Sequence, residues 1–67
     1  MQLQQEAAAY TQGKQTQFNE AISDYLKPLI TYLDDNLHNS KELQDIKYHL
    51  LMAKLLCRHS SEVHGIK

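Results

Sequence analysis

Residues 43–57, LQDIKYHLLMAKLLC, carry more large apolar side chains than one side of a helix can bury, and more charges than a buried helix tolerates. Every third or fourth residue of this stretch forms a seam with spacings of 3, 4, 3 and 4, which is the a and d pattern of a helical bundle. The seam consists of Leu43, Ile46, Leu50, Ala53 and Cys57. We expect it to face a neighbouring helix of the same chain, with Cys57 as a buried thiol.

A second apolar group, which we call the arc, lies on another side of the same predicted helix. The arc consists of Tyr48, Leu51, Met52, Leu55 and Leu56, and Val63 extends it. A helical hairpin offers only one neighbour, so the arc needs a second partner. Fully burying a leucine or methionine is worth about 1.5 to 3 kcal/mol, and four or five such residues together approach the whole stability of a small domain. We therefore expect self-association through the arc, into a homodimer or a higher oligomer.

The segment before this helix is also amphipathic. At about 100° per residue, one half of its helical wheel is apolar, and Pro28 lies inside the pattern. Proline removes a backbone donor and crowds the preceding turn, which predicts a kink there or a separate helix beginning at Pro28. The apolar half of residues 18–37 consists of Phe18, Ala21, Ile22, Tyr25, Leu26, Leu29, Ile30, Tyr32, Leu33 and Leu37.

Two polar stretches bound the helices. The apolar pattern stops in residues 36–40, NLHNS, where either Asn39 with Glu42 or Ser40 alone is a suitable N-cap. Gly65 suits the end of the second helix. These signals predict an all-α antiparallel hairpin that assembles into a bundle: one domain over 1–67, with a first helical segment over 1–37 that is kinked or broken near Gly13 and Pro28. A loop follows over 38–40, and a second helix over 41–64.

The amino-terminal residues leave one alternative open. Gly13 is a poor helix former, so residues 1–14 can form a third helix that folds back and covers the arc within one chain. Bulk properties do not choose between this and assembly, although chains of 67 residues bury only about 60% of their unfolded surface and often recruit a partner.

Composition excludes several classes of protein. The single cysteine forms no internal disulfide, which favours a reducing compartment, and we expect a cytoplasmic protein. No apolar run approaches the roughly 20 residues that span a bilayer. The net charge of -1 gives no general attraction to nucleic acid or to anionic membranes.

Chemical signatures are weak throughout the chain. Lys47, Lys54 and Arg58 form a basic stripe that suits phosphates or an acidic partner, although such stripes more often pair with neighbouring carboxylates. Cys57 and the histidines lack the spacing of metal ligands on a helix, and there is no phosphate loop and no activated nucleophile. We expect no metal, no cofactor and no enzymatic activity.

The length and hairpin layout resemble those of the small RNA-binding helical dimers of the Rop family, and of the small helical chaperones that hold secretion-needle subunits. We expect a non-enzymatic protein interaction module that self-associates through the arc. The first alternative is a small chaperone or adaptor whose arc binds a different protein. The second is a nucleic-acid-binding regulator that uses the basic stripe.

Overall fold

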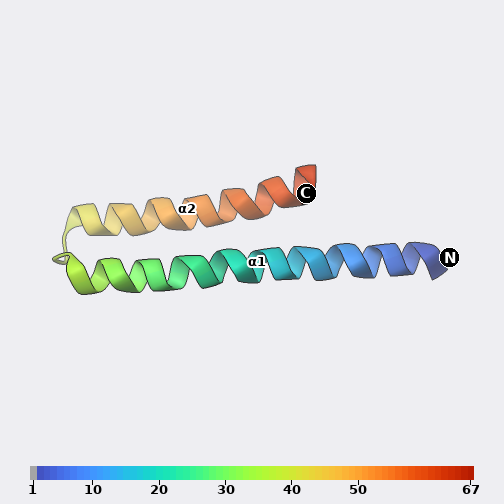
Figure 1. The fold of residues 1–67 in the computed structure, drawn as a ribbon. Coiled ribbons are helices and arrows are strands. Elements are labelled where there is room, and N and C mark those ends of the chain that lie inside the picture. Colours follow the sequence, from blue (N-terminus) through green and yellow to red (C-terminus); the bar gives the residue numbers. More distant parts are fainter. Residues whose placement is uncertain (1) are drawn as a thin grey trace.

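The computed structural model describes residues 2–67, with side chains from residue 13 onward, and it contains two helices and no strand over these residues. Helix α1 spans Gln2–Asn36, and helix α2 spans Lys41–His64. The helices run antiparallel and are joined by a short loop (Figure 1). The prediction of an all-α hairpin is confirmed.

The ends of α2 follow from local side-chain and backbone chemistry. The Ser40 Oγ atom accepts a hydrogen bond from the backbone N–H of Leu43 at 3.1 Å, which makes Ser40 the N-cap. Of the two caps that the sequence offers, Ser40 alone is therefore correct and Asn39 is wrong. At the other end Gly65 has a φ of 84°, and its N–H donates to the Ser61 carbonyl at 3.0 Å. Positive φ favours glycine because a Cβ atom is strained there.

Helix α1 lies within the first helical segment predicted over 1–37, and it passes through both Gly13 and Pro28 without a break. A break at either position, and a separate helix beginning at Pro28, are therefore wrong, while the kink stays a prediction. The helix ends at Asn36, whose Nδ2 atom donates to the Tyr32 carbonyl at 2.8 Å.

The third-helix alternative is also wrong. Residues 2–14 continue the axis of α1, and this part of α1 extends past the end of α2 instead of folding back over it (Figure 1). The arc is left without a cover from its own chain. At 1.5 Å per residue, the 35 residues of α1 span about 52 Å and the 24 residues of α2 span about 36 Å, so the beginning of α1 lies beyond the end of α2.

The hairpin is extended and has little interior. Its dimensions are 55 × 18 × 15 Å and its radius of gyration is 16.1 Å, against about 11 Å for a compact domain of this length. Among the described side chains, Leu43 at 3% exposure is the one buried apolar residue, and Ser61 at 6% is the one buried polar residue. None of these side chains is completely enclosed.

Candidate interaction surface

The face of α2 that contacts α1 differs from the predicted seam. Leu43 is buried and Leu50 is half-buried, as expected, but Ile46, Ala53 and Cys57 are exposed. The expectation of a buried thiol at Cys57 is wrong. Lys47 and Ser61 are the residues that turn toward α1 instead, so α2 is rotated about its axis relative to the apolar seam.

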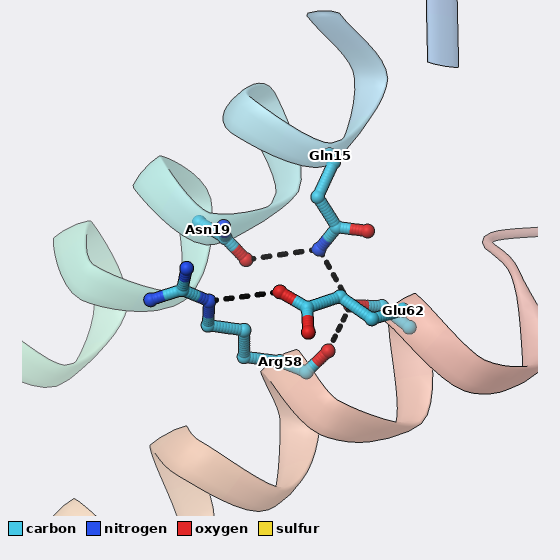
Figure 2. A network of polar contacts seen from close by, with 5 residues as sticks. Gln15, Asn19, Arg58 and Glu62 are labelled. Atoms are coloured by element: carbon cyan, nitrogen blue, oxygen red, sulfur yellow. Dashed lines mark hydrogen bonds and ion pairs between the residues drawn. The ribbon is translucent and has the colours of Figure 1, made fainter. Parts of the chain in front are cut away.

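Polar contacts between the helices account for this rotation. The Gln15 Nε2 atom of α1 donates to the Ser61 Oγ atom of α2 at 2.6 Å and to Asn19 Oδ1 at 3.1 Å. The Ser61 hydroxyl in turn donates to the Arg58 carbonyl at 2.7 Å. Figure 2 shows this network, with Gln15 and Asn19 reaching from α1 toward α2. Because a buried hydroxyl is costly without partners, the network holds Ser61 against α1.

A second polar contact acts near the loop end of the hairpin. The Lys47 Nζ atom lies 2.7 Å from Asp34 Oδ1, with both side chains partly exposed. An exposed pair of this kind contributes only about 0.2 to 1 kcal/mol. The pair contributes little stability, but it holds Lys47 on the side of α2 that faces α1, and Ile46 then points away from α1.

The arc lies on the side of α2 that faces away from α1. All five of its side chains are exposed, from 38% at Met52 to 63% at Leu56. Nothing in the hairpin lies on that side of α2 (Figure 1). The sequence predicted that a single hairpin leaves the arc uncovered, and the arc is exposed in the structure. Its use as an interface stays a prediction.

One edge of the arc meets α1 across a groove. Leu51 and Leu55 of the arc line it together with Phe18 and Ile22 of α1, and the cations Lys54 and Arg58 stand on the α2 side. Asn19 and Ser23 complete the α1 side. The groove thus joins the arc to a polar edge of α1.

A second apolar surface, which the sequence did not separate from the core, lies on one flank of the hairpin. We call it the tyrosine face, and its exposed members are Tyr25, Leu29 and Tyr32 of α1 and Ile46 of α2. On a helical wheel at about 100° per residue, Tyr25 and Tyr32 lie on one side of Ile22 and Ser23 lies on the other side. Ile46 and Cys57 lie next to each other on the wheel of α2. Cys57 and Phe18 line a second groove together with Leu56 of the arc. The signal in the sequence was the width of the apolar half of α1, which exceeds what one neighbouring helix can cover.

The basic stripe is partly neutralised within the chain. Lys47 pairs with Asp34, as described above, and Arg58 Nε lies 3.0 Å from Glu62 Oε1. Pairing with carboxylates is the ordinary explanation for such a stripe, and it leaves Lys54 as the member with no ion pair among the described residues. Nothing in this geometry favours phosphate binding.

Other kinds of site receive no support from the described part of the chain. No three His, Cys, Asp or Glu side chains from residue 13 onward come together as a metal site. Over the described residues, neither helix joins the length and the apolar character that crossing a bilayer requires. Comparisons with known proteins add no further constraint: no family, no curated protein and no solved structure matches this chain.

Proposed function

We propose that this protein is a non-enzymatic helical interaction module that self-associates through the arc of α2. The observation that carries the proposal is the imbalance between interior and surface. One described apolar side chain is buried, while the five arc residues are 38 to 63% exposed. Large apolar side chains left together on a surface mark an interaction site more often than a solvent-facing one.

The magnitude of the exposed area supports association. The chain exposes 5875 Å², whereas a folded monomer of 7.8 kDa is expected to expose about 4400 Å². The difference is about 1500 Å² per chain. A standard interface buries about 800 Å² per partner, so the surplus is large enough for one, although part of it belongs to the beginning of α1, which extends past α2 (Figure 1).

The mass of the purified chain in solution tests the proposal. We expect light scattering coupled to size-exclusion chromatography to give a dimer or a higher multiple of 7.8 kDa. Circular dichroism should show helical content that falls on dilution, because the hairpin alone buries little apolar surface. A helical monomer whose mass and helicity are independent of concentration would contradict self-association.

The second candidate is an adaptor or chaperone that binds a different protein. The tyrosine face favours it, because a contact made through the arc alone leaves Tyr25, Leu29 and Tyr32 uncovered. The two candidate functions predict different masses and helical contents for the isolated chain. A heterologous module stays monomeric and poorly folded until its partner is added, whereas a self-associating one reaches full helicity alone.

A further inference from the structure

The proposed self-association also has a direction. Resting on the proposed function, we infer that two copies pack α2 against α2 in antiparallel orientation, related by a two-fold axis that passes beside Met52. The partner is therefore a second copy of this chain, and the interface is isologous, meaning that both copies use the same residues.

The spacing of the arc allows this packing. Tyr48 and Leu56 lie four residues before and after Met52, so an antiparallel pair places Tyr48 of one copy opposite Leu56 of the other. Met52 then meets its own symmetry mate. Leu51 and Leu55 lie along one edge of this line and fill the space beside it, since residues at i, i+3, i+4 and i+7 share one face of a helix.

The charges at the two ends of the arc decide between antiparallel and parallel packing. Asp45 and His59 lie seven residues before and after Met52, and both are exposed on the same side of α2 as the arc. Lys41 and Glu62, also exposed, lie eleven residues before it and ten after it. Antiparallel packing brings Asp45 beside His59 of the other copy, and Lys41 beside Glu62. Parallel packing brings each of these residues beside the same residue of the other copy.

Antiparallel packing therefore places the Lys41 ammonium beside the Glu62 carboxylate of the other copy, whereas parallel packing places the two copies of each charged group side by side. The carboxylate of Asp45 can accept a hydrogen bond from the imidazole of His59 in either protonation state. Glu62 accepts from Arg58 through Oε1, which leaves its second oxygen available to Lys41 of the other copy. Like-charged groups side by side disfavour the parallel alternative, so the sequence of charges along α2 selects the antiparallel dimer.

Nothing in the hairpin obstructs this contact. Helix α1 packs on the side of α2 that carries Leu43, Leu50 and Ser61, which is opposite to the arc, and Figure 1 shows the outer side of α2 open along its length. The two α2 helices therefore form the middle of the assembly, and the two α1 helices lie outside them.

Disulfide trapping tests the orientation directly. In a Cys57→Ser background, three variants are compared: Met52→Cys, Tyr48→Cys and Leu56→Cys. A disulfide needs Cα atoms about 4.4 to 6.8 Å apart. We expect Met52→Cys alone to form a covalent dimer, Tyr48→Cys alone and Leu56→Cys alone to form none, and an equal mixture of the last two to form a covalent heterodimer.

Other patterns overturn the inference. Covalent dimers from Tyr48→Cys alone would mean parallel packing, and a non-covalent dimer that is trapped at none of the three positions would mean that the arc is not the interface. A monomeric mass of the unmodified chain would instead remove the proposed function itself. Each variant is first checked for its helicity and its mass under reducing conditions.

A charge exchange provides a second test that needs no disulfide. His59→Glu should weaken dimerisation severalfold, because it places a carboxylate beside Asp45 of the other copy, and Asp45→Lys should weaken it because the His59 imidazole loses its carboxylate acceptor. The double variant should recover the affinity of the unmodified chain, since the introduced ammonium and carboxylate then face each other. Double-variant affinity no better than that of the weaker single variant would refute the antiparallel register.

Discussion

Replacing Leu55 with glutamate should dissociate the assembly at protein concentrations where the unmodified chain is still assembled. Leu55 is 49% exposed in the hairpin, so association buries about half of its side chain. Full burial of a leucine is worth about 1.5 to 3 kcal/mol, which gives about 1 kcal/mol per chain and about 2 kcal/mol per dimer. A loss of about 2 kcal/mol corresponds to about a 30-fold increase in the dimer dissociation constant.

The glutamate adds a further cost, because its carboxylate loses water at an apolar contact and has no partner there. The expected increase is therefore larger than for Leu55→Ala, and sedimentation equilibrium measures both. Gln17→Glu is the matched control, since Gln17 is exposed on α1 and its wheel position faces away from α2. An unchanged dissociation constant for Leu55→Glu, or an equal change for Gln17→Glu, would refute the reasoning.

Five other substitutions test the hairpin itself, each by the free energy of unfolding at a fixed protein concentration. Leu43→Ala should cost about 2 to 4 kcal/mol, because Leu43 is 3% exposed and its removal leaves a cavity. Ser40→Ala should cost about 1 kcal/mol through loss of the N-cap, whereas Asn39→Ala should cost less because its Oδ1 atom accepts only from a side chain. Gly65→Ala should destabilise by about 1 kcal/mol because φ is 84°, and Gly13→Ala should stabilise by about 1 kcal/mol because Gly13 lies inside α1 with open space around it.

Sequence patterns predicted the parts of the fold that depend on neighbouring residues. The apolar period of 3.6 residues identified both helices, and Ser40 and Gly65 identified the ends of α2 through hydrogen bonds within one turn. The same local rules overstated the effect of Gly13 and Pro28. Each costs free energy inside a helix, but neither forbids it, and α1 continues through both.

The rotation of α2 was not predictable from apolar spacing, because it depends on pairs that are distant in sequence. The apolar pattern of residues 43–57 contains no information about Gln15, which contacts Ser61 although the two residues are 46 positions apart in the chain. Wheel projections rank side chains by polarity and treat serine and lysine as outward residues. Here Ser61 is buried and Lys47 is half-buried, so Ile46, Ala53 and Cys57 are displaced to the surface.

This displacement has a consequence for how the protein folds. Polar pairs position the two helices of one chain but add little stability, since an exposed ion pair contributes about 0.2 to 1 kcal/mol and a hydrogen bond about 0.5 to 1.5 kcal/mol. The larger free energy lies in the apolar side chains of the arc and the tyrosine face, which only another molecule can bury. Under the proposed function, folding and association are coupled: the hairpin contact sets which residues point outward, and we expect a second copy to supply the stability that keeps the hairpin formed.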